Sequence, residues 1–179
     1  DPVVCELIAD QLGNFWWGGS EYSIGRLAST PTAVQAAKDS IGGEITDAHA
    51  INRLVAELDG ANACTRRVAA KMLGNSTITT ARLNSLLGAQ SANVREAAAL
   101  AAGNSEHKDA VPALEHALDD GSPAVAAMAA WALGELEDHS AVPALLKLVR
   151  SGDTRVRLST IHALGQLEDP RAVPAIVVT

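Results

Sequence analysis

Histidine and cysteine are the residue types in this chain from which metal chemistry would be expected. Two histidines three to five residues apart on a helix, or a Cys-x-x-Cys pair, would predict a metal site. None of the five histidines has such a neighbour, and Cys5 and Cys64 lie far apart in the sequence. We therefore expect no metal and no cofactor. The histidines are His49, His107, His116, His139 and His162.

Nucleophilic and phosphate-binding motifs are also missing from the sequence. There is no Gly-x-Ser-x-Gly elbow, and Gly18-Gly19 lacks the surrounding residues of a phosphate-binding loop. We expect no catalytic residues and no enzyme activity within this segment. Three arginines, Arg66, Arg95 and Arg157, remain as candidates, because a row of guanidinium groups at equivalent positions would bind an anion.

The three arginines each stand at the second position of a ten-residue block that occurs six times in the sequence and closes on glycine. The closing glycines are 29, 32, 29, 31 and 31 residues apart, a period typical of stacked supersecondary units. A helix-capping residue type stands three residues before each block. The blocks predict helices near 2–13, 31–42, 63–74, 92–103, 123–134 and 154–165.

A second amphipathic segment precedes most blocks. Leu54, Leu83, Leu114 and Leu145 stand eleven residues before their block starts, and Val-Pro-Ala recurs at 111–113, 142–144 and 173–175. Apolar residues within the blocks follow the spacing of a core-facing helix. Each repeat is therefore predicted to be a helical hairpin, and the chain an all-α stack of five to six hairpins with no β-sheet.

Composition restricts the possible partners. Hydrophobic residues make up 47% of the 179 residues and aromatic residues only 3%, and the formal net charge is −7. An acidic chain is a poor ligand for nucleic acid, which is bound through Lys and Arg. No apolar run has the length of a membrane span. Two cysteines too far apart to pair favour a reducing compartment such as the cytoplasm.

The run Val142-Pro-Ala-Leu-Leu-Lys-Leu-Val-Arg-Ser-Gly-Asp-Thr-Arg-Val-Arg, continued by Ala163-Leu-Gly-Gln-Leu-Glu-Asp-Pro-Arg-Ala-Val-Pro, resembles the HEAT repeat. It is most similar to the short HEAT-like subtype of phycobilisome (PBS) lyases. The resemblance covers residues 47–179 well and 1–46 loosely. It implies a single right-handed α-solenoid over 1–179, with second helices lining the concave side.

The resemblance also implies roles for some of the candidate residues. In similar repeats the arginine at the second block position pairs with a turn aspartate of a neighbouring repeat, for which Asp59, Asp120 and Asp153 are available. One HEAT-like enzyme family, deoxyhypusine hydroxylase, binds iron through His-Glu pairs at the third and fourth positions. Arg67-Val68, Glu96-Ala97, Ala127-Met128 and Leu158-Ser159 stand there instead, so that chemistry is not expected of this segment.

The partner-binding surface is predicted from block positions three and seven, which lie off the apolar stripe and are expected to face the concave groove. Trp131 is the expected anchor, exposed and flanked by Leu100 and Leu158; the alternative is that its ring packs between adjacent helices. The predicted contact residues are Arg67, Lys71, Glu96, Leu100, Trp131, Leu158 and His162.

The aromatic run Phe15-Trp16-Trp17 has no counterpart in the other repeats. It is expected either to plug one end of the stack or to contact a partner. Because apolar residues stand at the end of the sequence, we expect a segment of a longer protein, with flanking domains of the same chain as further partners.

We expect a non-catalytic scaffold or arm that binds a protein or peptide in its concave groove. The alternatives are a bilin lyase-type or chaperone subunit and a HEAT arm attached to a larger enzyme. A DNA-binding HEAT-like protein would need a basic concave face, which the acidic composition opposes.

Overall fold

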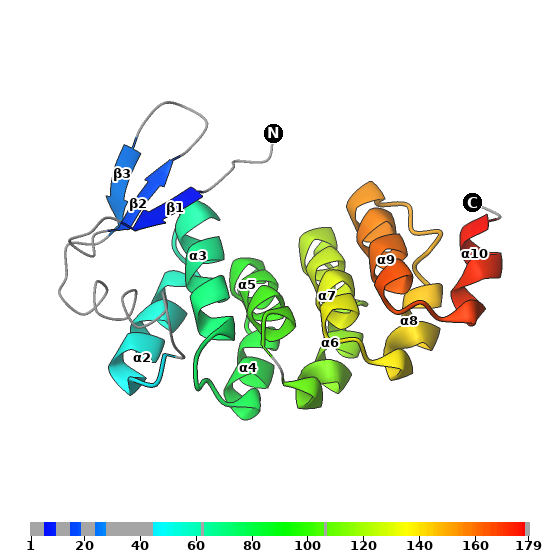
Figure 1. Ribbon diagram of the computed structural model, residues 1–179, viewed down its shortest axis with the longest axis horizontal. Coiled ribbons are helices and arrows are strands. Elements are labelled where there is room, and N and C mark those ends of the chain that lie inside the picture. Colours follow the sequence, from blue (N-terminus) through cyan, green and yellow to red (C-terminus); the bar gives the residue numbers. More distant parts are fainter. Residues whose placement is uncertain are drawn as a thin grey trace. The chain divides into compact units, whose positions relative to one another are not determined.

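The computed structural model describes residues 6–9, 15–18, 24–27, 45–61, 63–105 and 107–177, most of which are helical (Figure 1). The chain divides into two compact units, Asp1–Thr77 and Ile78–Thr179. Among the described residues, no helix combines the length and the apolar character needed to cross a membrane.

The first unit contains a small antiparallel sheet of β1 (Glu6–Ala9), β2 (Phe15–Gly18) and β3 (Ile24–Leu27), in that order. Glu6 pairs with Gly18, and Phe15 pairs with Leu27. The helix predicted near 2–13 is therefore wrong at Glu6–Ala9, as is the expected absence of β-sheet. Aromatic and β-branched residues favour strands, and Phe15-Trp16-Trp17 offers residues 6–9 a pairing partner. The helix predicted near 31–42 lies outside the described residues.

The first unit also contains the helical hairpin of α2 (Ala48–Glu57) and α3 (Ala63–Gly74). Asp47 caps α2, because its carboxylate accepts hydrogen bonds from the backbone N–H groups of His49 and Ala50 at 3.3 and 3.0 Å. Ile45, two residues before Asp47, donates its N–H to the Asn75 carbonyl at 2.9 Å. This bond ties the entry to α2 to the segment that follows α3.

The described residues of the second unit form three helical hairpins and one further helix. A short 3₁₀ turn precedes the first helix of every repeat after the first. In Figure 1 the second helices α5, α7 and α9 stand in one row, and α4, α6 and α8 in another. The all-α solenoid predicted from the sequence is confirmed for these helices. The elements are α4 (Thr80–Leu87), α5 (Ala92–Gly103), η1 (Lys108–Ala110), α6 (Val111–Ala117), α7 (Pro123–Glu135), η2 (His139–Ala141), α8 (Val142–Leu146), α9 (Thr154–Gln166), η3 (Pro170–Ala172) and α10 (Val173–Val177).

The second helices of the second unit begin directly after the capping residues from which their starts were predicted. Ser91, Ser122 and Asp153 are the N-cap residues of α5, α7 and α9. Asp153 accepts hydrogen bonds from the N–H groups of Arg155 and Val156 at 2.8 and 3.2 Å. The bounds of α3 and α5 coincide with the helices expected near 63–74 and 92–103, and α7 and α9 each end one residue beyond those expected near 123–134 and 154–165.

The core of the second unit is built from the repeated leucines. Leu83, Leu114 and Leu145 are fully buried, and so is Val149, which stands seven residues before its block. Burying a Leu or Val side chain contributes about 1.5–3 kcal/mol relative to leaving it exposed. The residues at these constant offsets in the sequence are therefore core residues of their repeats.

The closing glycines let neighbouring second helices approach closely. A Cβ on Gly103 of α5 would stand 2.8 Å from the Ala132 Cα of α7, and one on Gly134 of α7 would stand 2.8 Å from the Ala163 Cα of α9. Both distances are shorter than a carbon–carbon contact allows. At Gly165, the equivalent residue of α9, no heavy atom of the described residues lies within 4 Å of that position, apart from the chain neighbours and backbone of α9 itself.

Candidate functional site

The repeated arginines hold the turns of their own hairpins. In each case Nη1 donates a hydrogen bond to a backbone carbonyl six residues earlier, in the turn before the second helix. A guanidinium used in this way is directed along its own turn, which supports a structural role over an anion-binding row. The bonds run from Arg66 to Gly60 at 2.8 Å, from Arg95 to Ala89 at 2.8 Å and from Arg157 to Ser151 at 2.6 Å.

Arg95 also makes the ion pair to a neighbouring repeat that the resemblance implied. Its Nε and Nη2 donate to the two carboxylate oxygens of Asp120 at 2.6 and 2.9 Å. This bidentate hydrogen bonding lowers the pKa of the Asp120 carboxyl and raises the pKa of Arg95. Asp120 in turn accepts from the Ser122 N–H at 2.8 Å, so the pair links the turns before α5 and α7.

A second charged cluster lies at the 3₁₀ turns, where sequence analysis assigned no function. The buried carboxylate of Asp169 accepts two bonds from the Arg171 side chain, at 2.6 and 2.9 Å, and one from the Arg171 N–H. Hydrogen bonding to Arg171 holds the pKa of Asp169 well below its usual range. His139 of the preceding repeat lies 3.5 Å from the same carboxylate. The recurrence of Asp138 and Asp169, each four residues before Val-Pro, is the signal that could have revealed it.

The described residues include no group of three or more His, Cys, Asp or Glu side chains placed to hold a metal ion. His49, His116, His139 and His162 are exposed, and His107 is half-buried. The histidines of the described residues therefore do not come together in one cluster.

The predicted contact residues differ widely in exposure. Arg67 and Lys71 are exposed on α3 of the first unit. In the second unit Glu96 is half-buried, but Leu100 is only 7% exposed. Leu100 is therefore not part of an open surface, which corrects the expectation that it flanks an exposed Trp131.

The Trp131 ring packs against the neighbouring second helix, α5. The indole Cζ3 lies 2.7 Å from the position that a Cβ on Gly103 would take, so the ring rests on the Gly103 backbone of α5. Leu100 stands one helical turn before Gly103, on the same face of α5. Trp131 itself is half-buried, so the structure combines the two alternatives: the ring packs between helices and one part of it reaches solvent.

Met128 is a neighbour of Trp131 that the sequence reasoning missed. It stands one turn earlier on α7 and is half-buried, whereas Ala127 is only 8% exposed. The partly exposed side of α7 therefore carries Met128 and Trp131, at block positions four and seven. Ala127, at position three, belongs instead to a buried cluster with Val156 of α9. The sequence of α7 alone does not show which face is buried, since alanine occupies six of its thirteen positions and lies on all sides of the helix.

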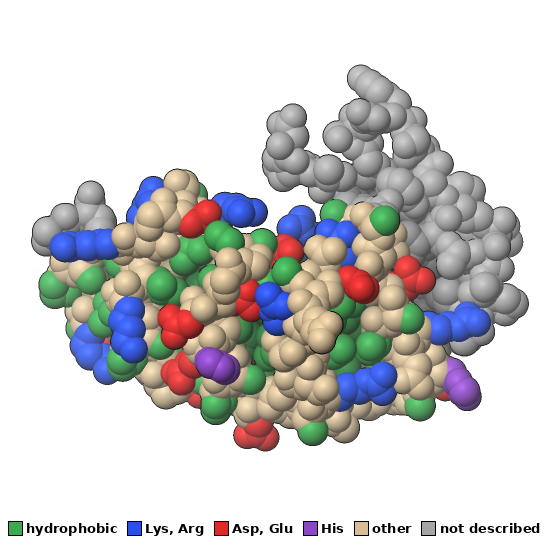
Figure 2. Space-filling view, turned by 180° about the vertical axis from the view of Figure 1, so that it is seen from behind, with side chains coloured by type: hydrophobic (Ala, Val, Ile, Leu, Met, Phe, Trp, Pro, Cys, Tyr) green, Lys and Arg blue, Asp and Glu red, His purple; other side chains and the backbone are tan. Residues whose placement is uncertain are grey.

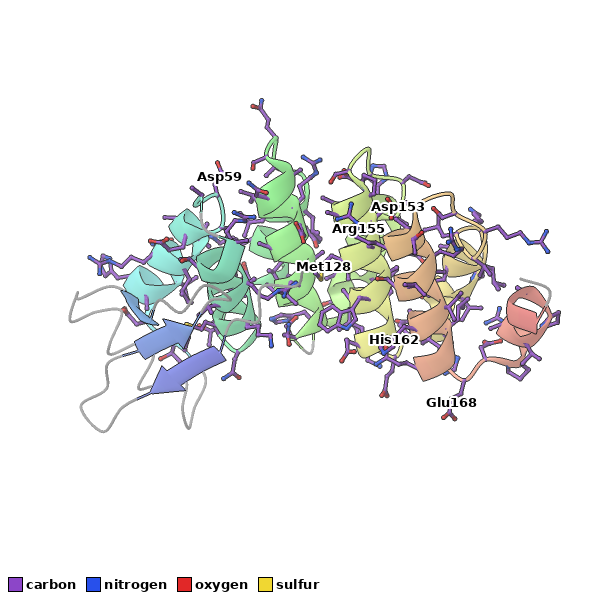
Figure 3. The ribbon with its side chains drawn as sticks, turned by 90° about the horizontal axis from the view of Figure 1, so that it is seen from above. Asp59, Met128, Asp153, Arg155, His162 and Glu168 are labelled. Atoms are coloured by element: carbon purple, nitrogen blue, oxygen red, sulfur yellow. The ribbon has the colours of Figure 1, made fainter. Side chains whose placement is uncertain are left out.

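On α9 the two predicted residues are exposed. Leu158 has 62% of its surface accessible, and His162 is exposed as well. Figure 3 shows Met128 on α7 and His162 on the neighbouring second helix, α9, with Asp153 and Arg155 at the opposite end of α9 from His162. The run Phe15-Trp16-Trp17 forms most of β2, and its side chains lie outside the described part.

Charged side chains of both signs are interspersed over the described helices on the face seen in Figure 2. The basic side chains there do not gather into one broad patch. A nucleic-acid interface needs such a patch to neutralise phosphates. Met128 and Trp131 form a half-buried apolar pair on α7, which we call the α7 patch.

Repeated helical hairpins, stacked through small residues on their second helices, define an α-helical repeat protein. The family model for HEAT repeats matches residues 51–122 and 116–177, which together span most of the chain. The chain therefore belongs to the HEAT-repeat family.

The chain is also similar in fold to a solved structure, that of human deoxyhypusine hydroxylase in complex with glycerol. The two share 24% sequence identity with a TM-score of 0.55, and the match covers 78% of this chain. The chain spans 59% of the length of that enzyme. At this identity the likeness is one of fold alone. None of the curated proteins matches the chain.

Proposed function

We propose that this segment is a non-catalytic protein-interaction scaffold that binds a protein or peptide at the α7 patch, Met128 and Trp131. The observation that carries the proposal is the partial exposure of both side chains on a helix whose other large apolar residues, Val125 and Leu133, are fully buried. Tryptophan is enriched among residues that dominate binding energy, and methionine adapts to apolar ligands of different shape.

The packing of Trp131 supports a role as an anchor. Its ring is held against the Gly103 backbone, so little side-chain freedom remains to be lost when a partner binds. A partner would therefore gain apolar contact at a small entropic cost. Glu96 on α5 and His162 on α9 are the polar residues that we propose at the edges of the contact, with Leu158 beside His162.

The first unit offers a separate proposed contact. Arg67 and Lys71 are exposed one turn apart on α3 and form a small basic pair. A partner with an acidic segment would be attracted to this pair, in contrast to the acidic balance of the whole chain. We propose the pair as a peripheral contact, because charges at the edge of an interface affect association rate more than affinity.

Two narrower functions belong to the same proposal as alternatives. A bilin lyase-type or chaperone subunit would follow from the short HEAT-like repeat, and an arm of a larger enzyme would be consistent with the likeness in fold to an enzyme. Bilin absorbance of the purified chain after co-expression with a bilin-producing system would favour the first. Its absence would leave the scaffold as proposed.

The scaffold proposal is tested by selecting peptides from a displayed random library against the full chain and measuring their affinity for two variants. Met128→Glu places a charge in the α7 patch, and we expect at least a tenfold loss of affinity. Ala81→Glu adds the same charge at an exposed position of α4 and should bind as the original chain does. Equal affinity of the two variants would show that the peptides bind elsewhere, provided that circular dichroism shows both to be folded.

A further inference from the structure

The partly exposed side of α7 also carries a carboxylate in line with the α7 patch. Met128, Trp131 and Glu135 follow one another at intervals of three and four residues, so they lie on one face of the helix. Met128 and Trp131 are half-buried, and Glu135 is exposed. An apolar side chain, an indole ring and a negative charge therefore succeed one another along two turns of α7.

The carboxylate of Glu135 is held in place by the neighbouring second helix. Its Oε1 accepts a hydrogen bond from the Gln166 Nε2 of α9 at 2.8 Å. A carboxylate has about four acceptor sites, so this bond orients the group and leaves acceptor capacity for a ligand. The Trp131 ring is held against the Gly103 backbone of α5. Both groups are therefore positioned before any partner binds.

The place of Glu135 is unfavourable for the helix that carries it. Glu135 is the last residue of α7, and the C-terminal end of a helix has a negative partial charge that favours cations over carboxylates. No residue of α7 is Lys or Arg, and the one cationic residue of α5, Arg95, is bound to Asp120. Residues 104–141 contain eight Asp or Glu and one Lys. A cation beside Glu135 would therefore be attracted by both the carboxylate and the helix end.

Among α5, α7 and α9, the combination of an indole and a carboxylate occurs on α7 alone. The equivalent residues are Leu100 and Asn104 on α5 and His162 and Gln166 on α9, and neither pair includes a carboxylate. The exposed cation of α9, Arg155, lies at the opposite end of its helix from His162 (Figure 3). The surface of α7 is therefore the one that is complementary to a positive charge.

We propose that the α7 patch and Glu135 together bind a Lys or Arg side chain of a peptide partner; this names the chemistry of the partner and rests on the proposed function. The apolar stem of the Lys or Arg would lie against the Trp131 indole while its cation pairs with the Glu135 carboxylate. The indole adds to the attraction, because its ring face is negatively polarised. An aliphatic side chain of the same peptide would cover Met128.

Peptides selected from a displayed random library against the full chain are the probe, and we expect Lys or Arg close to an aliphatic residue to recur among them. Glu135→Gln keeps the size of the side chain but removes its charge, and should weaken peptide binding by about threefold or more. Glu115→Gln makes the same change at a partly exposed position of α6 and should bind as the original chain does. A peptide with norleucine in place of its Lys or Arg should bind more weakly and should not distinguish Glu135→Gln from the original chain.

The fluorescence of Trp131, measured with Trp16→Phe and Trp17→Phe, separates this proposal from the one on which it rests. Peptides that change the Trp131 emission but lack Lys and Arg, or that bind Glu135→Gln as tightly as the original chain, would overturn the cation site and leave the scaffold. Unchanged emission at saturating peptide would overturn both. If circular dichroism shows Glu135→Gln to be unfolded, equal binding of the Lys or Arg peptide and its norleucine form by the original chain is the overturning result.

Discussion

The closing glycines predict opposite effects of one substitution at two equivalent places. Gly134→Ala and Gly165→Ala both replace the next-to-last residue of a second helix and gain the same intrinsic helix propensity, at most about 1 kcal/mol. At Gly165 nothing opposes this gain, because the new methyl group enters open space. We therefore expect Gly165→Ala to raise the free energy of unfolding by up to about 1 kcal/mol.

At Gly134 the new methyl group would stand 2.8 Å from the Ala163 Cα and 2.9 Å from its Cβ. Carbon atoms pack at about 3.5–4.0 Å, so α7 and α9 must separate locally by roughly 0.6–1.2 Å. Such overpacking typically costs about 1–3 kcal/mol. Since propensity cancels between the two variants, Gly134→Ala should be less stable than Gly165→Ala by about 1–3 kcal/mol.

Urea denaturation followed by circular dichroism at 222 nm measures this difference directly. Gly103→Ala is a second test at the α5–α7 interface and should behave like Gly134→Ala. Equal stabilities of Gly134→Ala and Gly165→Ala would refute the claim that close backbone approach between second helices holds the array together.

Three further predictions concern single residues of the second unit. Glu137 has a φ of 50°, so Glu137→Gly should raise the free energy of unfolding by about 0.5–1 kcal/mol in urea denaturation, while Glu137→Ala should not. Arg95→Met removes the bidentate pair with Asp120 and should lower the free energy of unfolding by about 1.5–3 kcal/mol; an unchanged urea midpoint would assign the pair no stabilising role. The folded-state pKa of Asp169 lies below the unfolded value of about 4, so its contribution is present above that pH and lost as the pH falls below it. Asp169→Asn should therefore flatten the decrease in urea midpoint between pH 5 and pH 3, and an equally steep decrease in the variant would contradict this.

The sequence predicted the helical repeats well because several signals coincide in each of them. Ser122 marks the start of α7, and Leu114 and Val125 occupy the positions that the repeat requires of core residues. Each signal is local and follows from capping, propensity or the period of the helix. The strands at 6–9, 15–18 and 24–27 were not predicted, because strand pairing between segments is not visible in a local helical pattern.

The candidate site was only partly predictable. Trp131 could be identified from its residue type, but the direction of its ring depends on the space left by Gly103 on another helix. The choice between positions three and four on α7 depended likewise on how closely α9 approaches. Sequence periodicity predicts which face of a single helix is apolar. The exposure of a side chain on α7, however, also depends on how closely the neighbouring helices α5 and α9 pack against it.

The claim that a partner binds at the α7 patch is tested most directly by the fluorescence of Trp131. With Trp16→Phe and Trp17→Phe, Trp131 is the single tryptophan of the chain, so its emission reports this surface alone. Addition of a peptide selected against the chain should shift the emission to shorter wavelength, with a titration curve that matches the peptide's affinity. Unchanged emission at saturating peptide would contradict the account and place the partner elsewhere on the chain.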